Sequence, residues 1–488
     1  MNETLRRTKI VATLGPATDA PGMLERLIAE GVDVVRLNLS HGVAADHQRR
    51  AAATRTAAAA AGREVAVLAD LQGPKIRIER FAGGPVTLVV GAEFMLDCRA
   101  QAAPGDIHRV GVSYAGLPND VTAGDVLLLD DGLIALEVLD VRGVEIRTRV
   151  RVGGVLSDRK GLNRQGGGLS VGALSDKDRA DIRLAAELGA DFLAVSFVRS
   201  AADIEEARAL LRAAGGEAGL VAKIERADAI PVLASIIDAS DVVMVARGDL
   251  GVEIGDAELP GLQKKIIREA VQRNRAVITA TQMLQSMVSA PIPTRAEVLD
   301  VANAVIDGTD AVMLSQETAA GAHPDLAVAA MRRICLGAER QFEPREDPRA
   351  DQHHLDRSDQ AIARAAMVLA GEIGARAIVA LTESGGTALW LSRYRSAVPI
   401  YALSRNAAAR RRMLLLRDVL PVAFDSAETG AAAHARAAVQ HLFAQDLLVE
   451  GDRVILTHGD QTGRHGSTNT LKLLSVGPDG IAESLRDL

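Results

Sequence analysis

The sequence is poor in aromatic residues and almost free of cysteine. Its 488 residues include one Trp, three Tyr, seven Phe and two Cys. So few aromatic rings leave little to stack on nucleic-acid bases, and the net charge of −7 disfavours binding to a phosphate backbone. Cys98 and Cys335 are too few for a disulfide framework or a thiolate metal site and are typical of a reducing compartment. We therefore expect no nucleic-acid partner.

Long hydrophobic runs are also missing. No apolar stretch approaches the roughly 20 residues that a membrane-spanning helix needs, and no signal-type apolar segment follows the basic start of the chain. Because 48% of the residues are apolar and 24% are charged, the chain can bury a large core, and its length predicts several domains. We expect a multidomain cytoplasmic protein with no membrane partner.

Eight short apolar runs alternate with helical stretches through the first and middle parts of the chain. Their apolar residues are consecutive, which is typical of strands buried on both faces of a parallel sheet. Ser175 and Asp203 stand where two of the helices should have their N-caps. Eight such alternations predict a (β/α)8 barrel. The predicted strands are Lys9–Leu14, Val32–Leu37, Glu64–Ala69, Asp191–Val195, Leu220–Ala222, Asp241–Val245, Ala276–Thr279 and Ala311–Leu314.

Two intervals depart from this alternation. Between Gly73 and about Leu169, strand-like pieces broken by turn residues predict a small all-β domain inserted in a barrel loop, where it would act as a lid. The polar stretch Gln341–Asp356 predicts a linker to a separate C-terminal α/β unit. We therefore predict an α/β fold with a TIM barrel over 1–72 and 170–343, a β-barrel lid over 73–169 and a C-terminal α/β regulatory domain over 344–488.

Polar residues mark the same end of at least six predicted strands, where barrel enzymes carry their catalytic groups. Glu225 and Asp249 are hard oxygen ligands suited to Mg²⁺. Arg36 and Lys223 are fixed cations that could offset the charge of a transferring phosphoryl group. An oxygen-rich group able to hold another cation consists of Asn38, Ser40 and Asp70. The pattern predicts a metal-dependent enzyme that acts on an anionic substrate.

Each of these residues also has a simpler explanation. Lys223 and Glu225 could form a solvated ion pair, the triplet Arg247–Asp249 could be a turn, and Asp70 could cap a helix. An enzyme is favoured because the polar groups gather at one end of the strands and not at the other. The sequence has no Gly-Lys-Ser or Gly-Lys-Thr, which argues against a nucleotide site of the P-loop type.

Several long motifs resemble pyruvate kinase, and the resemblance covers nearly the whole chain. The motifs are Thr8–Thr18, Arg36–Gly42, Asp70–Arg77, Met244–Ile254, Thr279–Met283 and Pro293–Asn303. The resemblance implies transfer of a phosphoryl group from phosphoenolpyruvate to ADP in glycolysis, giving ATP and pyruvate. It also implies Mg²⁺ or Mn²⁺ as the cofactor, allosteric control through the C-terminal domain and assembly as a homotetramer.

Individual roles follow from the same resemblance. Glu225 and Asp249 would hold the divalent metal, and Lys223 would stabilise the phosphoryl group in flight. The implied substrate-binding residues are Arg36, Gly248, Asp249 and Thr281, with Thr281 also beside the enolate and its proton source. The nucleotide-side positions are Thr13, Pro16, Asn38, His41, Arg77 and Lys160, of which Lys160 belongs to the lid and would require its closure.

The segment after Asp70 indicates whether the enzyme needs K⁺ for activity. Family members that need K⁺ have Thr after this Asp and Glu at the position of Lys75, whereas this chain has Leu71 and Lys75. The residues that would line the site of a monovalent cation are Asn38, Ser40, Asp70 and, through its carbonyl group, Leu71. Since a tethered ammonium is a compact point charge, our hypothesis is that Lys75 replaces K⁺ among them and that K⁺ is not required. The alternative is that Lys75 is an ordinary surface residue beside a proline.

A turn rich in small residues marks the C-terminal domain. Hydroxyls and free N–H groups between a strand and a helix can cradle a phosphate, although such a turn can equally be only a helix cap. The family places an allosteric phosphate-ester site here, facing the loop Gly459–Gly466. We therefore expect a phosphorylated effector of open identity at Thr382, Ser384, Gly385, Gly386 and Thr387.

Two other functions stay open at this point. One is a different barrel enzyme acting on phosphoenolpyruvate or oxaloacetate, such as a lyase, although it would lack the lid and the nucleotide-side residues. The other is a catalytically silent metabolite sensor, against which Arg36, Lys223, Glu225, Asp249 and Thr281 are all intact.

Overall fold

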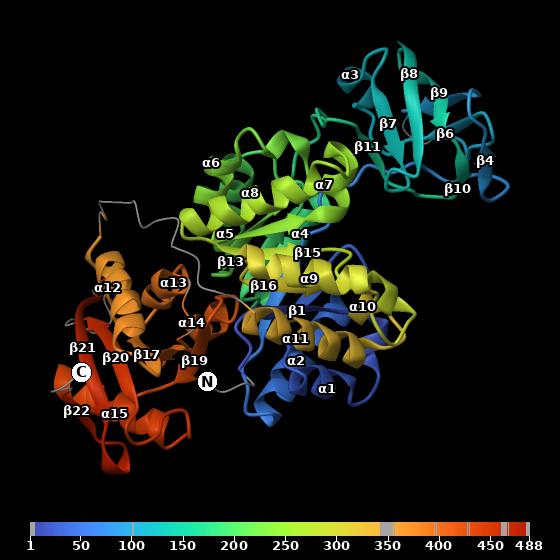
Figure 1. Cartoon of the computed structure of the whole chain (residues 1–488). Coiled ribbons are helices and arrows are strands. Elements are labelled where there is room, and N and C mark those ends of the chain that lie inside the picture. The colour runs from blue at the N-terminus through green and yellow to red at the C-terminus, as the bar shows by residue number, and fades with distance from the viewer. Residues whose placement is uncertain are drawn as a thin grey trace.

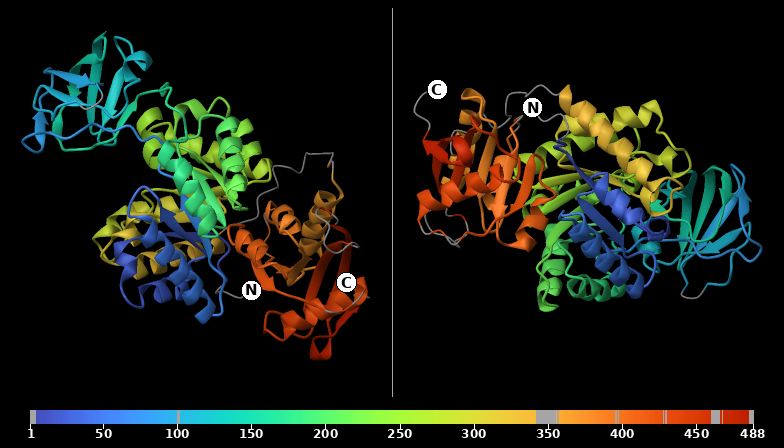
Figure 2. Two further views of the ribbon diagram at one scale, coloured as in Figure 1. Left: turned by 180° about the vertical axis from the view of Figure 1, so that it is seen from behind. Right: turned by 90° about the horizontal axis from the view of Figure 1, so that it is seen from below.

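The computed structural model describes residues 5–99, 102–341, 357–394, 398–426, 430–459 and 468–484, together with residues 355, 396, 428 and 466. Figures 1 and 2 show three bodies in a row. A barrel lies in the centre, a small β domain stands out from one end of it, and a C-terminal α/β domain packs against the other end. The predicted fold class is confirmed.

The barrel consists of eight parallel strands, closed in the order β1-β16-β15-β14-β13-β12-β3-β2. Every strand predicted from a consecutive apolar run is present, with small shifts at its ends, and nearly all of these strand residues are buried, as such runs require. The strands are β1 (Lys9–Leu14), β2 (Val34–Asn38), β3 (Ala66–Asp70), β12 (Phe192–Val195), β13 (Gly219–Ile224), β14 (Val242–Ala246), β15 (Ala276–Ala280) and β16 (Ala311–Leu314).

Helices surround the barrel and bury their apolar faces against the strands. The Ser175 cap is confirmed, because its side chain accepts a hydrogen bond from the backbone N–H of Asp178. The Asp203 cap is wrong. Ser200, in extended backbone, is the N-cap, and Asp203 is the third helical residue whose carboxylate accepts from Ser200 N at 2.9 Å. The helices are α1 (Met23–Ala29), α2 (Ala44–Ala60), α4 (Asp176–Glu187), α5 (Ala201–Ala213), α6 (Leu233–Ala239), α7 (Arg247–Ile254), α8 (Leu259–Gln272), α9 (Arg295–Asp307), α10 (Gln316–Ala319) and α11 (Pro324–Arg340).

The inserted domain lies between β3 and β12 and has a hydrophobic core of its own. It is almost entirely β, with one helical turn, α3 (Leu117–Asp120). Its strands β6, β10 and β11 have three residues each, which is too few to show an alternating pattern in the sequence. The strands are β4 (Val86–Leu88), β5 (Glu93–Asp97), β6 (Arg109–Gly111), β7 (Val126–Leu129), β8 (Ile134–Arg142), β9 (Glu145–Val152), β10 (Gly154–Leu156) and β11 (Leu162–Arg164).

The C-terminal domain is a six-stranded sheet in the order β19-β18-β17-β20-β21-β22 with helices packed on it. The predicted linker Gln341–Asp356 and most of the loop Gly459–Gly466 lie outside the described residues. The elements are α12 (Ser358–Glu372), β17 (Ala377–Leu381), α13 (Gly386–Ser392), β18 (Ile400–Ser404), α14 (Ala407–Met413), β19 (Val419–Ala423), α15 (Ala431–Phe443), β20 (Arg453–Gly459), β21 (Thr468–Val476) and β22 (Ala482–Ser484).

Buried polar contacts fasten the C-terminal domain to the amino ends of the barrel strands. The Arg393 guanidinium pairs with Asp310, which precedes β16, with Nη1 to Oδ2 at 3.0 Å. Lys9 Nζ donates to the carbonyl oxygen of Val419 at 2.6 Å. The lid, in contrast, is connected at the carboxyl ends of the strands, so the two additional domains flank opposite ends of the barrel (Figure 1). No helix in the described ranges is long and apolar enough to cross a membrane.

Candidate active site

Four charged side chains from three strands meet in one buried cluster. Arg36 lies in β2, Asp70 ends β3, and Lys223 and Glu225 lie at the end of β13. Arg36 Nε donates to Asp70 Oδ2 at 2.6 Å. Lys223 Nζ lies 3.3 Å from Asp70 Oδ1 and 3.0 Å from Glu225 Oε1. Since none of the four is more than 9% exposed, this is a desolvated network and not a solvated ion pair or a helix cap.

The charges in this cluster compensate one another unevenly. Burial alone would raise the pKa of Asp70, but Lys223 and Arg36 hold it below its usual value. Burial would lower the pKa of Lys223, but Asp70 and Glu225 hold it above its usual value, so Lys223 is a fixed cation at neutral pH. The pKa of Glu225 is raised, first by burial and then by Asp249 and Asp70, although Lys223 opposes this. Burial and the two neighbouring acids therefore outweigh the compensation that Lys223 gives to Glu225.

Glu225 and Asp249 are suited to share a divalent cation. Glu225 is held in place by Phe197 N, which donates to Oε2 at 2.8 Å, and Asp249 lies in the first turn of α7. Mg²⁺ commonly takes one or two carboxylates and completes its shell with water and substrate oxygens. The described residues contain no cluster of three or more His, Cys, Asp and Glu side chains that could hold a metal. A cation bound by these two carboxylates would therefore keep positions open for a substrate.

Lys75 forms an ion pair with Asp249. Its Nζ is 3.0 Å from Asp249 Oδ1. Asp70, at the centre of the expected position, already pairs with Arg36 and Lys223. Asp249 has no other cationic partner in the part of the chain that the structure describes. An ammonium group is attracted most strongly to the carboxylate whose charge is least compensated, which accounts for the pairing of Lys75 with Asp249.

The other oxygen groups of the expected monovalent position are neighbours at the ends of β2 and β3. Asn38 is paired in register with Asp70, and Asn38 Oδ1 accepts from Ser40 N at 3.2 Å. The carbonyl oxygen of Leu71 accepts from Ser196 Oγ at 2.8 Å. The structure thus brings these groups to one rim of the barrel.

Thr281 is held against the first turn of α7 in a strained backbone conformation. Its φ is +68°, which is rare for a β-branched residue. Its Oγ1 accepts from Gly248 N at 2.8 Å, and its carbonyl oxygen accepts from Arg247 Nη2 at 2.7 Å. Arg247 is buried and also pairs with Asp300 at 2.7 Å. The triplet Arg247–Asp249 therefore begins a helix and is not the simple turn that was the alternative. Its Gly248 N–H fixes the position of the Thr281 hydroxyl.

Four nucleotide-side residues lie on the barrel. Thr13 is buried at the end of β1, where its Oγ1 accepts from Arg36 Nη1 at 3.1 Å. Asn38 is half-buried. Pro16 and His41 are exposed in the loops that follow β1 and β2. Thr13 is thus joined directly to the charged cluster, while the other three leave an accessible surface beside it.

The remaining two, Arg77 and Lys160, belong to the lid and make their contacts there. Arg77 Nη1 donates to the carbonyl oxygen of Arg159 at 3.0 Å, and Lys160 Nζ pairs with Asp130 at 2.7 Å. The lid stands away from the barrel in this structure (Figure 1). The structure therefore does not gather these two residues with the barrel residues.

Two residues of the site were not singled out as functional from the sequence. Ser196 Oγ accepts from Lys223 Nζ at 2.6 Å and so fixes the position of the ammonium group. Ser196 directly follows β12, the fourth barrel strand, so the rule of polar residues at strand ends could have identified it. Arg247, which positions Thr281, directly follows β14, so the same rule marks it, but residue type does not show that its guanidinium is buried.

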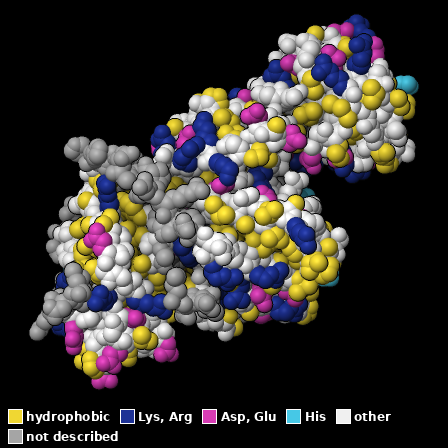
Figure 3. Space-filling model, viewed as in Figure 1, with side chains coloured by type: hydrophobic (Ala, Val, Ile, Leu, Met, Phe, Trp, Pro, Cys, Tyr) yellow, Lys and Arg dark blue, Asp and Glu magenta, His cyan; other side chains and the backbone are white. Residues whose placement is uncertain are grey.

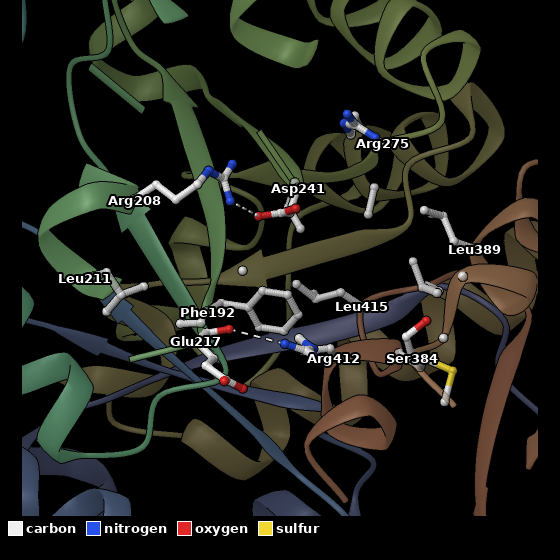
Figure 4. A pocket seen from close by; sticks show the side chains of 18 of the residues that line it. Phe192, Arg208, Leu211, Glu217, Asp241, Arg275, Ser384, Leu389, Arg412 and Leu415 are labelled. Carbon is white, nitrogen blue, oxygen red and sulfur yellow. Dashed lines mark hydrogen bonds and ion pairs between the residues drawn. The ribbon is translucent and has the colours of Figure 1, made fainter. Parts of the chain in front are cut away.

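The turn after β17 uses its threonines within the C-terminal domain. Thr382 Oγ1 accepts from Gly385 N at 3.0 Å and closes the turn before α13, which has no side-chain cap of its own. Thr387 Oγ1 lies 2.6 Å from Thr468 Oγ1 and is buried. Ser384, Gly385 and Gly386 line a cavity that is also lined by residues of the barrel (Figure 4).

The site as a whole combines fixed cations with neighbouring carboxylates in a largely desolvated place. Such an arrangement stabilises an anion whose charge shifts during a reaction, because the groups need no reorganisation at that moment. The chemistry it fits best is transfer of an anionic group assisted by a divalent ion.

Comparisons with known proteins identify related chains over nearly the full length. Residues 5–328 match the family model of the pyruvate kinase barrel domain, and residues 360–474 match that of the pyruvate kinase alpha/beta domain. The chain is 54% identical to pyruvate kinase II of Salmonella typhimurium over 98% of its own length and all of the relative's. It is 51% identical to a pyruvate kinase of Haemophilus influenzae over 96% of its length and 98% of the relative's.

Proposed function

The chain belongs to the pyruvate kinase family, and on this premise we propose that it transfers the phosphoryl group of phosphoenolpyruvate to ADP at the carboxyl ends of its barrel strands, giving ATP and pyruvate in glycolysis. The observation that supports this site most strongly is the buried cluster of Arg36, Asp70, Lys223 and Glu225 beside Asp249. The test is an assay of pyruvate formation from phosphoenolpyruvate with ADP varied. Pyruvate formation that does not depend on ADP would contradict this function, because the phosphoryl group would then pass to water.

Lys223 and Arg36 would act on the phosphoryl group. Arg36 would hold phosphoenolpyruvate, and Lys223 would neutralise the phosphoryl charge in flight. Both cations are fixed in place, Arg36 by Asp70 and Thr13, and Lys223 by Ser196, Asp70 and Glu225. Phosphoryl transfer depends mainly on positioning and electrostatic stabilisation, which a rigid pair of cations supplies.

Glu225 and Asp249 would hold the divalent ion, Mg²⁺ or Mn²⁺. When bound, such an ion acts as a Lewis acid that polarises and orients substrate oxygens. The raised pKa of Glu225 indicates that burial and the neighbouring acids disfavour its bare negative charge, so a cation at this place relieves that cost. Lys75 would have to give up its contact with Asp249 Oδ1 to the ion.

Thr281 would serve the second half of the reaction, in which the enolate receives a proton on carbon. Its hydroxyl accepts from Gly248 N and donates to the carbonyl oxygen of Ala280 at 2.7 Å, so its orientation is fixed. Thr281 and Gly248 would also contact the substrate. A hydroxyl held in this way can position a proton source beside the substrate.

ADP would lie between the barrel and the closed lid. Thr13, Pro16, Asn38 and His41 would contact it from the barrel, and Arg77 and Lys160 from the lid. Closure of a β domain excludes water from a phosphoryl transfer that would otherwise be lost to hydrolysis.

Lys75 is proposed to make K⁺ unnecessary. We expect turnover in tetramethylammonium buffer to be the same with and without K⁺, because the tethered ammonium supplies a monovalent charge at the substrate site. Lys75→Glu should be activated many-fold by K⁺, whereas Lys265→Glu, a charge reversal at an exposed site on α8, should not be. A many-fold rise of the unaltered enzyme with K⁺ would contradict this proposal.

A homotetramer is proposed as the assembly. Hydrophobic side chains gather over the region of α9 and α11 in Figure 3, where Ile292 is 71%, Leu299 65% and Leu326 45% exposed. An apolar surface of this kind typically marks a protein interface.

Leu299→Asp is therefore expected to shift the assembly toward species smaller than a tetramer, down to the 51.3 kDa chain, because a buried carboxylate at an apolar interface is unfavourable. Mass photometry measures this. Val152→Asp, at a 50% exposed valine of the lid, is the matched control and should leave the mass unchanged. An unchanged mass for Leu299→Asp would place the interface elsewhere.

The remaining features are proposed on the resemblance. The chain would be cytoplasmic, with a barrel over 1–72 and 170–343, a lid over 73–169 and a regulatory domain over 344–488. A phosphorylated effector would bind at Thr382, Ser384, Gly385, Gly386 and Thr387. Isothermal titration with phosphorylated metabolites tests this, and binding that survives Thr387→Ala would exclude a role for the Thr387 hydroxyl.

A further inference from the structure

Lys223 reaches across a barrel strand to make its contacts. It lies in β13, whereas Asp70 ends β3, and β12 stands between these two strands in the barrel. Ser196 directly follows β12 and is 1% exposed. Its hydroxyl therefore lies at the end of the strand that the Lys223 side chain must cross to reach Asp70.

The ammonium group of Lys223 has three partners of different kinds. Its Nζ lies 2.6 Å from Ser196 Oγ, and the distances to Glu225 Oε1 and Asp70 Oδ1 are 3.0 Å and 3.3 Å. The two carboxylates compensate its charge, but an attraction between charges has little directional preference. A hydrogen bond is short and directional. Ser196, the nearest of the three, thus fixes where the ammonium group lies without neutralising it.

The Ser196 hydroxyl is itself held in one orientation. Its Oγ donates to the carbonyl oxygen of Leu71 at 2.8 Å, so its one proton is used and a lone pair is left for the ammonium group. An ammonium group has donors only, which matches this arrangement. The orientation of the hydroxyl is therefore set by the backbone of Leu71, in the segment that leads from β3 into the lid.

The loop that carries Ser196 has little room to shift. The next residue, Phe197, has φ +56°, which is rare for a bulky residue, and its N–H donates to Glu225 Oε2 at 2.8 Å. Such a backbone persists where the surrounding contacts hold it. One contact is Gly73, where an added Cβ would lie 2.7 Å from Ser196 Cβ and 2.8 Å from Phe197 Cδ2. The loop is therefore packed tightly against the start of the lid segment.

We propose that Ser196 is a positioning residue of the phosphoryl transfer, which holds the Lys223 ammonium group where the charge of the phosphoryl group is neutralised. Without Ser196, Asp70 and Glu225 alone would place the ammonium group and would draw it toward themselves. Because Ser196 acts through Lys223, this inference rests on the proposed function.

Ser196→Ala is expected to lower kcat by about tenfold or more, because it removes the charge-assisted hydrogen bond that orients the cation. The KM for phosphoenolpyruvate should change by less than about twofold, since Arg36 and the charge of Lys223 stay in place. Both constants are measured by pyruvate formation with ADP and Mg²⁺ saturating.

Ser240→Ala is the matched control. Ser240 is 2% exposed, and its Oγ donates to the carbonyl oxygen of Ile236 at 2.7 Å. It precedes β14 and so lies at the amino ends of the barrel strands, away from the site. Each variant removes a buried hydroxyl that donates to a carbonyl oxygen, so thermal melting should show similar losses of stability. Only Ser196→Ala should lose turnover.

A double-mutant cycle with Lys223→Met separates positioning from a general structural effect. A residue that acts through Lys223 has nothing to position once the ammonium group is removed. In the Lys223→Met background, Ser196→Ala should therefore change the residual turnover by less than about twofold. If Ser196 only supported Leu71 and the lid segment, the same loss would appear in both backgrounds.

Three results would overturn the inference. They are full turnover of Ser196→Ala, a loss that lies entirely in KM, and a loss of the same factor with and without Lys223. An unaltered protein that forms no pyruvate from phosphoenolpyruvate and ADP would refute the proposed function itself, which differs from an active enzyme that is indifferent to Ser196.

Discussion

Lys223→Met is expected to lower turnover by on the order of 10²–10³-fold or more, because it removes the cation that neutralises the phosphoryl group during transfer. Phosphoenolpyruvate should still bind through Arg36, so the loss should appear in kcat more than in KM. Turnover is measured by coupling pyruvate formation to a dehydrogenase, with ADP and Mg²⁺ saturating.

The variant must also be shown to be folded. Removing one partner from a buried ion pair commonly costs about 3–5 kcal/mol, but Asp70 keeps Arg36 and Glu225 already has a raised pKa, so protonation of Glu225 can limit that cost. Circular dichroism compares the variant with Lys265→Met, an exposed lysine on α8. Undiminished turnover of a folded Lys223→Met enzyme would remove Lys223 from the mechanism.

Glu225→Gln is expected to separate activity from stability. Turnover should fall by on the order of 10²–10³-fold, since a neutral amide is a poor ligand for a divalent ion and cannot balance its charge. The metal-free protein should be as stable as the unaltered one or more stable, because burial, Asp249 and Asp70 all disfavour the charged carboxylate in the fold.

The pH dependence of stability follows from the same raised pKa. Between the ordinary glutamate pKa and the raised pKa of Glu225, the folded state binds more protons than the unfolded state, so stability falls as the pH rises through this window. This component should be absent in Glu225→Gln. Thermal melts of both proteins across this range, without metal, measure it. A variant that is clearly less stable than the unaltered protein at neutral pH would contradict the argument.

The barrel and the charged cluster could be predicted from the sequence for a physical reason. Strands buried on both faces need consecutive apolar residues, and side chains at the carboxyl ends of parallel strands share one rim. These two rules place Arg36, Asp70, Lys223 and Glu225 together at one rim of the barrel.

Other parts of the site depend on contacts that no local pattern encodes. The pairing of Lys75 with Asp249 depends on which carboxylates the remaining cations have already neutralised. Thr281 has a left-handed backbone conformation, and its carbonyl oxygen accepts a hydrogen bond from the buried Arg247, which lies far from it in the sequence.

Titration of Mn²⁺ followed by electron paramagnetic resonance tests most directly whether the two rim carboxylates hold one ion. We predict a single Mn²⁺ per chain in the unaltered protein, weakened about tenfold or more in both Glu225→Gln and Asp249→Asn and unchanged in Arg333→Glu. Unchanged Mn²⁺ affinity in either carboxylate variant would contradict the account.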